Sequence, residues 1–235
     1  METRTAVGFR EIWSQKYSAG GGPVTAAVSQ RIASILAWIF LKSNASPNTI
    51  TVAGGGVSLI GSIMYVLFPI GGIYSILCLV IYQLGYCLDC ADGQVARASK
   101  TSTEFGALLD VAVDVVTQLA QAFAILYWLG GVLGSLDIQI VVAIVSLSAG
   151  RVLVVITGKY TSHHRHTEKA GMSKSKIKFF LLGILDTPVL LACFALLRDY
   201  PSILIWYVFF MGVAYSANSF YLAWTRLYLR VDRPS

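Results

Sequence analysis

The sequence predicts an all-α integral membrane protein, a six-transmembrane-helix bundle with an N-terminal interfacial amphipathic helix. Of its 235 residues, 56% are hydrophobic and 13% are charged, whereas soluble domains average about 45–50% and about 25%. Several apolar stretches reach or approach the roughly 20 residues that a helix needs to cross a bilayer. Lys and Arg concentrate in alternate connections between these stretches, which is typical of a multi-span topology.

The N-terminal region, residues 1–47, is expected to be a cytoplasmic arm that ends in a juxtamembrane helix. No early apolar stretch follows its charged start, so we expect no cleaved signal peptide. The apolar run Ile32–Leu41 is too short to span a bilayer and is flanked by Arg31 and Lys42. We therefore expect Val24–Lys42 to lie as an amphipathic helix in the cytoplasmic interface.

The remaining residues, 48–235, are expected to form one transmembrane catalytic domain, because their length suits a single bundle. Its six predicted helices are Ile50–Phe68, Ile73–Tyr86, Gly106–Leu129, Ile138–Thr157, Ile177–Leu197 and Ile203–Tyr228. The second helix is apolar over too short a length to span by itself. We expect it to continue within the protein through the residues around Asp89.

Positive charge predicts the orientation of the bundle in the cell membrane. Of the 18 Lys and Arg residues, only Arg198 falls in a segment placed on the non-cytoplasmic side. Because cytoplasmic loops carry an excess of Lys and Arg, both termini and the Asp89–Asp114 connection are expected in the cytoplasm. Topology and anionic lipid headgroups then account for the net charge of +6, and nucleic acid is not expected as a partner.

Four carboxylates between Asp89 and Asp114 lie in or beside apolar sequence, where an unpaired charge is costly. On a helix, Asp89 and Asp92 share one face because they are three residues apart. Asp110 and Asp114 share one face because they are four residues apart. Two such pairs on facing helices would form a ring of oxygen ligands suited to Mg²⁺ or Mn²⁺. The pattern therefore predicts metal-assisted chemistry on phosphates.

The same stretch resembles the signature of the CDP-alcohol phosphotransferase family of integral membrane enzymes. It reads D-x-x-D-G-x-x-A-R, then eight residues, then G-x-x-x-D-x-x-x-D. All of its fixed positions match, namely Asp89, Asp92, Gly93, Ala96, Arg97, Gly106, Asp110 and Asp114. A weaker resemblance is Pro47–Thr51, which is similar to the family's P-[ND]-x-[hydrophobic]-T segment at the start of its first membrane helix.

The resemblance implies a transfer reaction that releases CMP from a CDP-linked alcohol with the help of two divalent ions, Mg²⁺ or Mn²⁺. The implied metal ligands are Asp89, Asp92, Asp110 and, at the second ion, Asp114. Asp114 also matches the position of the proton acceptor. The implied contacts to the nucleotide and the CDP-lipid are Asn48, Thr49, Ile50, Thr51, Gly93, Arg97 and Thr103.

The sequence identifies the acceptor alcohol less precisely than the metal and nucleotide contacts. Arg151, Lys159 and Arg165 could hold a phosphorylated acceptor, such as glycerol 3-phosphate or an inositol phosphate, although a solvated positive-inside loop explains the basic segment equally well. A motif of E-R-P type, carried by bacterial members that use inositol phosphate, is absent there, which counts against that acceptor. Asp186, in the middle of the fifth predicted span, could bond across helices or line the acceptor cavity. No role follows for the histidines of the basic segment, His163, His164 and His166.

We therefore expect a phospholipid-synthesis transferase that moves a phosphatidyl group from CDP-diacylglycerol to a small polar alcohol at a site facing the cytoplasmic leaflet. Its surroundings are membrane lipids, and a homodimer is left open. One alternative is the transfer of a phospho-alcohol from a soluble CDP-alcohol, of the choline or ethanolamine type, to a lipid alcohol. Another is an ion or proton transporter. Transporters usually contain repeated halves, whereas the acids here concentrate in one segment.

Overall fold

The computed structural model describes residues 7–18, 22–69, 71–135, 137–162 and 186–231, which form helices and connections without a β-strand. The elements are α1 (Phe9–Trp13), the π-helical turn η1 (Thr25–Ser29), α2 (Gln30–Lys42), α3 (Pro47–Leu67), α4 (Gly72–Ala98), α5 (Glu104–Leu133), α6 (Ile138–Ser162), α8 (Thr187–Leu196), the 3₁₀ turn η2 (Leu197–Asp199) and α9 (Pro201–Val231). The all-α prediction is confirmed for this part of the chain.

Four of the described helices are long and apolar enough to cross a membrane: α3, α4, α5 and the Pro201–Asn218 part of α9. Within α6, a shorter apolar stretch covers Ile140–Leu153. The predicted helix Ile177–Leu197 is described only from residue 186 onward. The count of six spans therefore stays a prediction. Large apolar side chains on the outer faces are exposed, as a surface covered by lipid requires; they include Leu67, Phe123, Tyr127, Trp206 and Phe210.

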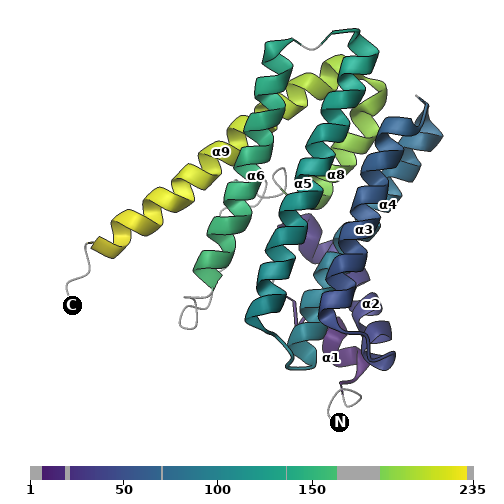
Figure 1. The fold of residues 1–235 in the computed structure, drawn as a ribbon. Coiled ribbons are helices and arrows are strands. Elements are labelled where there is room, and N and C mark those ends of the chain that lie inside the picture. The colour runs from purple at the N-terminus through teal and green to yellow at the C-terminus, as the bar shows by residue number, and fades with distance from the viewer. Residues whose placement is uncertain (1–6, 19–21, 70, 136, 163–185, 232–235) are drawn as a thin grey trace.

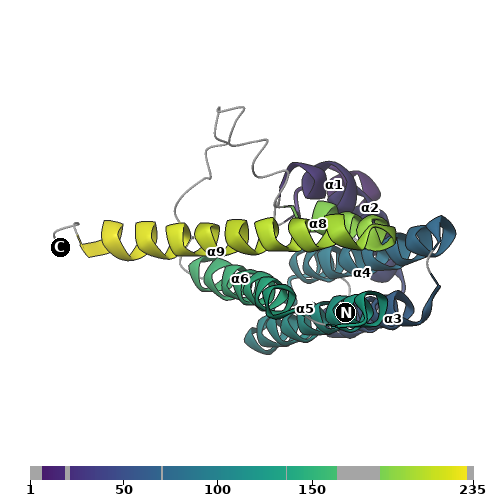
Figure 2. The same cartoon turned by 90° about the horizontal axis from the view of Figure 1, so that it is seen from above.

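The helices form a bundle whose two ends differ. At one end lie α1, α2 and the α4–α5 connection, and at the other lie the α3–α4 and α8–α9 connections (Figure 1). Both α2 and α8 pack on α4, and α6 pairs with α9. In Figure 2, α4 lies between two groups of helices: α1 and α2 lie on one side of it, and α5 lies on the other. The predicted metal and nucleotide site lies at the same end of the bundle as α1 and α2.

Side-chain caps determine where two of these helices begin. The Ser46 hydroxyl accepts a hydrogen bond from the Thr49 backbone N–H (3.1 Å), and Pro47 occupies the first turn of α3, where its fixed φ fits. The Thr103 hydroxyl likewise accepts from the Gly106 N–H (3.0 Å) at the start of α5. Both helix starts lie at the end of the bundle where α4 finishes (Figure 1).

The helix α4 runs without a break through the Asp89–Asp92 segment, which confirms the predicted continuation of the second span. Its neighbour α3 packs against both α4 and α5. A Cβ atom added at Gly54 would lie 3.1 Å from the Leu88 side chain of α4. One added at Gly55 would lie 2.5 Å from Val113 Cγ1 of α5. Two adjacent glycines therefore let α3 approach both carboxylate-bearing helices closely.

The N-terminal segment Val24–Lys42 is helical, as η1 followed by α2, while its predicted amphipathic character stays a prediction. The buried apolar residues of α2 are Ala33, Ala37 and Leu41, and its exposed isoleucines are Ile32, Ile35 and Ile39. The helix packs on α4 and leaves these isoleucines on its outer face. Its location in the membrane interface stays a prediction.

Arg198, the cation that the sequence places on the non-cytoplasmic side, is a buried structural residue. Its guanidinium donates to the carbonyls of Phe68 and Pro69, the latter at 3.0 Å. It also lies over the rings of Tyr65 (5.4 Å) and Trp128 (5.5 Å). These contacts join the α3–α4 and α8–α9 connections at that end of the bundle.

Candidate functional site

Three of the four predicted carboxylates meet between α4 and α5. One oxygen from each of Asp89, Asp92 and Asp110 lies within 4.8 Å of the others. Asp92 is buried and accepts a hydrogen bond from the Thr51 hydroxyl of α3, whereas Asp89 and Asp110 are partly exposed. Three carboxylates held this close repel one another unless a cation lies among them, and their oxygens are the ligands that hard divalent cations prefer. The donor set therefore fits Mg²⁺ or Mn²⁺.

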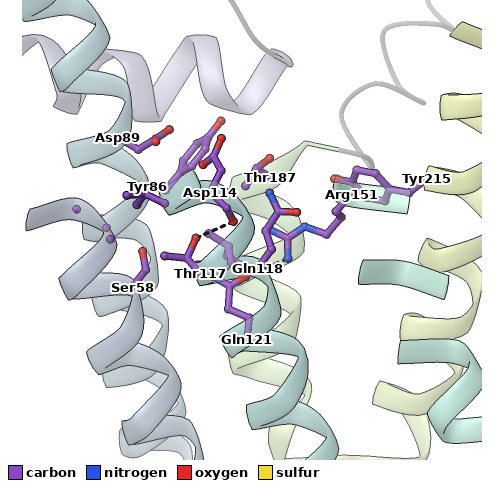
Figure 3. Close-up of a pocket in the computed structure, with 15 residues that line it drawn as sticks. Ser58, Tyr86, Asp89, Asp114, Thr117, Gln118, Gln121, Arg151, Thr187 and Tyr215 are labelled. Atoms are coloured by element: carbon purple, nitrogen blue, oxygen red, sulfur yellow. Dashed lines mark hydrogen bonds between the residues drawn. The ribbon is translucent and has the colours of Figure 1, made fainter. Parts of the chain in front are cut away.

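The fourth carboxylate, Asp114, is not within that distance of all three. It lies one helical turn beyond Asp110 on α5 and lines a neighbouring cavity together with Asp89 and Arg151. Figure 3 shows Asp89 and Arg151 toward opposite sides of this cavity, with Asp114 between them. Asp114 is thus placed to contact a molecule in the cavity while remaining close to the group of three.

This central cavity has a volume of about 260 Å³. Six helices contribute to its wall, namely α3, α4, α5, α6, α8 and α9. Its polar lining residues are Ser58, Tyr86, Asp89, Asp114, Thr117, Gln118, Gln121, Arg151, Thr187 and Tyr215. The Arg151 guanidinium is buried and donates to Gln121 Oε1 (2.9 Å). The buried guanidinium suits an anionic group, and the hydroxyl and amide groups suit a polar molecule.

A second cavity, of about 140 Å³, lies beside the same carboxylates. Its lining comes from the start of α3, the end of α4, the α4–α5 connection and the start of α5. The lining residues are Pro47, Asn48, Thr51, Asp92, Gly93, Ala96, Thr101, Ser102, Thr103, Gly106, Ala107 and Asp110. The two segments that carried the family resemblance therefore border one site.

Four of the predicted nucleotide contacts line this second cavity: Asn48, Thr51, Gly93 and Thr103. The other three line neither cavity, and two of them, Thr49 and Ile50, point away from the site. Thr49 is exposed and shares a hydrogen bond with Ser46 (2.7 Å), and Ile50 is buried in the apolar cluster that also contains Ala91. The helical turn of α3 directs these two side chains away from the site, because adjacent residues on a helix point in different directions.

Arg97 lies at the edge of the second cavity. Its side chain is exposed, and its Nε donates to the Tyr17 carbonyl of the N-terminal arm (2.5 Å). A Cβ atom added at Gly93 would lie 3.0 Å from Arg97 Nη1, so the guanidinium sits directly against that glycine. Arg97 therefore lies next to a residue that lines the cavity, although it does not line the cavity itself.

Among the predicted acceptor contacts, only Arg151 can be placed. The Lys159 side chain and all of Arg165 lie outside the described residues, as do the three histidines. Sequence reasoning missed Gln118 and Gln121, although they continue the Asp110–Asp114 face of α5 and are polar residues in an apolar span. Thr187 and Tyr215 were also missed, and nothing in the sequence relates them to the acids.

Asp186 was predicted in the middle of the fifth span, but in the structure it is the residue before a helix. It has extended backbone (φ −73°, ψ 133°) and precedes α8, so no helix passes through it. Its buried carboxylate accepts hydrogen bonds from the Thr25 N–H (2.7 Å) and the Thr25 hydroxyl (2.5 Å). It lines neither of the two cavities. Of the two roles left open, the structure therefore supports a bond across the fold.

Comparison with known proteins agrees with this geometry. A family profile described as CDP-alcohol phosphatidyltransferase matches residues 44–216, which include the carboxylates and both cavities. A phosphatidylinositol phosphate synthase of Mycobacterium marinum is 32% identical over 117 residues, 50% of this chain and 47% of the relative. Proteins of the same name from Corynebacterium glutamicum (33% over 101 residues, 43% and 44%) and Mycobacterium tuberculosis (30% over 103 residues, 44% and 46%) are also similar. The aligned part of the chain spans about half the length of these relatives.

The profile covers most of the chain, and the matched segment contains every carboxylate of the site. The chain belongs to the CDP-alcohol phosphatidyltransferase family, a family of transferase enzymes.

Proposed function

We propose that the protein transfers a phosphatidyl group from CDP-diacylglycerol to an inositol phosphate and releases CMP. The observation that carries this proposal is the position of Asp89, Asp92 and Asp110 between two polar cavities. One cavity is bordered by the segments that resemble the family's nucleotide contacts. The other contains a buried Arg. A donor in the first and an acceptor in the second would meet at the carboxylates.

The three clustered carboxylates would hold the divalent metal, and Asp114 would complete a second metal position. Mg²⁺ or Mn²⁺ bound there would neutralise the pyrophosphate oxygens and the charge that develops on the leaving CMP. The Thr51 hydroxyl donates to Asp92 and would orient its carboxylate for the metal.

Asp114 is suited to accept a proton from the acceptor. It lines the acceptor-side cavity, so a hydroxyl bound there lies within its reach. In the proposed reaction this hydroxyl oxygen forms a bond to the phosphorus that carries the diacylglycerol. The bond from that phosphorus to the CMP oxygen breaks, CMP leaves with the electron pair, and Asp114 takes the hydroxyl proton.

Arg151 supports a phosphorylated acceptor. A buried guanidinium in a polar cavity offers paired donors that match phosphate oxygens. The amide groups of Gln118 and Gln121 and the hydroxyls of Thr187 and Tyr215 could bind the hydroxyl groups of a polyol ring. The names of the relatives favour an inositol phosphate over glycerol 3-phosphate, against the expectation from the missing E-R-P-type motif. Family membership gives no support to an ion or proton transporter.

The test is a transfer assay with purified protein in lipid nanodiscs, CDP-diacylglycerol and Mg²⁺ or Mn²⁺. Inositol phosphate, inositol and glycerol 3-phosphate are supplied separately, and CMP release and the lipid product are measured. Inositol phosphate should be used with the highest kcat/KM, and inositol, which lacks the phosphate that Arg151 would bind, should be poor. Preferential use of glycerol 3-phosphate or of inositol would refute the proposed acceptor. CMP formation only from soluble CDP-alcohols would refute the proposed donor.

A further inference from the structure

Asp186 is a buried carboxylate that the proposed reaction does not use. It occupies the position before α8 where an Asp side chain usually accepts from the N–H groups of the first helical turn. Here it makes no such side-chain bond, and Pro188 removes one of the candidate donors. Both carboxylate oxygens instead accept from Thr25, Oδ2 from the backbone N–H and Oδ1 from the hydroxyl. Both oxygens of this carboxylate therefore bond to a residue 161 positions earlier in the chain.

Thr25 extends this contact to the wall of the central cavity. Its hydroxyl lies 3.0 Å from the Tyr86 hydroxyl of α4. Because the single Thr25 hydroxyl proton is donated to Asp186, the Tyr86 hydroxyl is the donor in this second bond. Tyr86 lines the central cavity, and so does Thr187, the residue that follows Asp186. Figure 3 shows Tyr86 and Thr187 bordering the cavity on either side of Asp114.

The segment around Thr25 is shaped to make this contact. A Cβ atom added at Gly22 would lie less than 3 Å from both oxygens of the Asp186 carboxylate, so only glycine allows this approach. Thr25 begins the π-helical turn η1, a rare conformation that is frequent at functional sites. Farther along, Gln94 of α4 donates to the Gln30 carbonyl (3.1 Å) and to its side-chain oxygen (2.7 Å), which fixes α2 on the bundle. Thr25 and Asp186 are themselves 1% and 5% exposed, so water competes little for their bonds.

We propose that Thr25 and Asp186 form a positioning pair that fixes the Tyr86–Thr187 side of the central cavity, so that the N-terminal segment controls acceptor binding. Thr25 precedes the residues matched by the family profile, which begin at residue 44. A segment outside the matched region therefore supports the cavity wall from behind, through its bonds to Tyr86 and Asp186. The hydrogen bonds described above link the pair to the wall of the central cavity and to no residue that lines the second cavity, so we expect it to act on the acceptor and not on the nucleotide. The identity of this acceptor rests on the proposed function.

The first arm of the test needs no catalysis. Amide hydrogen exchange is measured in nanodiscs for the parent protein and for Thr25→Val, which keeps the side-chain shape and the backbone N–H but removes the hydroxyl. Exchange should accelerate in residues 22–29 and also in residues 187–191, because both depend on the pair. Ser34→Ala is the matched control, since Ser34 is a buried hydroxyl of α2 that bonds to Gln30, Ile12 and Gln15 and lines neither cavity. Unchanged exchange at residues 187–191 in Thr25→Val would overturn the inference, regardless of the catalytic activity of the variant.

The second arm separates positioning from general destabilisation. Thr25→Val should raise the acceptor KM by up to about tenfold, which is the factor that corresponds to the full loss of the hydrogen bond to the Asp186 carboxylate, and leave the CDP-lipid KM within about twofold. Thr25→Ser, which restores the hydroxyl, should recover the acceptor KM, and Ser34→Ala should leave both KM values unchanged. Loss of folded protein alone would lower the rate without moving either KM. Equal changes in both KM values, or no rescue by Ser, would refute the positioning role, whereas failure of the parent protein to use any inositol phosphate would refute only the proposed acceptor.

Discussion

Replacing Arg151 with Gln should weaken binding of the acceptor much more than binding of the CDP-lipid. The Arg151 guanidinium is 8% exposed and lines the central cavity, so solvent screens its interactions little. A hydrogen bond to a charged group contributes about 1.5–3 kcal/mol. Because about 1.4 kcal/mol corresponds to a factor of ten, the acceptor KM should rise by roughly 10- to 150-fold. Two parallel bonds to one phosphate would place the effect toward the upper end of this range.

The assay measures initial rates of CMP release while inositol phosphate is varied at saturating CDP-diacylglycerol, and then the reverse. Arg151→Lys keeps the charge but loses the planar pair of donors, so its acceptor KM should lie between those of the parent and Arg151→Gln. Lys42→Gln removes one positive charge from an exposed position away from both cavities and serves as the control. An acceptor KM within twofold of the parent value in Arg151→Gln would refute the reasoning. So would an equal increase in Lys42→Gln, because net charge would then explain the effect.

Four further results are expected. Chelation with EDTA should abolish turnover and added Mg²⁺ or Mn²⁺ should restore it, whereas Asp92→Asn should require much more metal; full activity in excess EDTA would exclude the metal site. Asp114→Asn should lower kcat by about 10²–10⁴-fold with the CDP-lipid KM within a few-fold, because Asn cannot accept the proton, and recovery of normal kcat at high metal would make Asp114 a ligand only. Gly55→Ala should destabilise the protein by about 1–3 kcal/mol through overlap with Val113, as measured by thermal unfolding, whereas Gly56→Ala, whose added Cβ meets no atom within 4 Å, should change stability little. Single cysteines in the α4–α5 connection should react with an impermeant reagent only from the cytoplasmic side, and labelling from outside would reverse the predicted orientation.

The sequence alone predicted the features that depend on local spacing and composition. Long apolar stretches predicted membrane helices, because the bilayer requires every backbone polar group to bond within its own segment. The spacing of the four acids predicted shared helix faces, and the structure gathers Asp89, Asp92 and Asp110 accordingly. The same spacing led to the family, which the profile match confirms. These inferences hold because the number of residues between two positions on a helix determines the angle between their side chains.

The tertiary structure determined which helix faces pack against one another. The sequence did not distinguish Thr51, which bonds to Asp92, from Ile50, which turns into an apolar cluster, because the packing of α3 between its neighbours sets that choice. It proposed Arg151 as an acceptor contact and a cross-helix bond for Asp186, but it could not identify the cavity that Arg151 shares with Asp89 and Asp114 or Thr25 as the partner of Asp186. These contacts link segments far apart in the chain. Periodicity predicts which face of a helix is polar. Only helix packing, through close approach and the burial of polar groups that must find partners, determines which polar faces share a cavity.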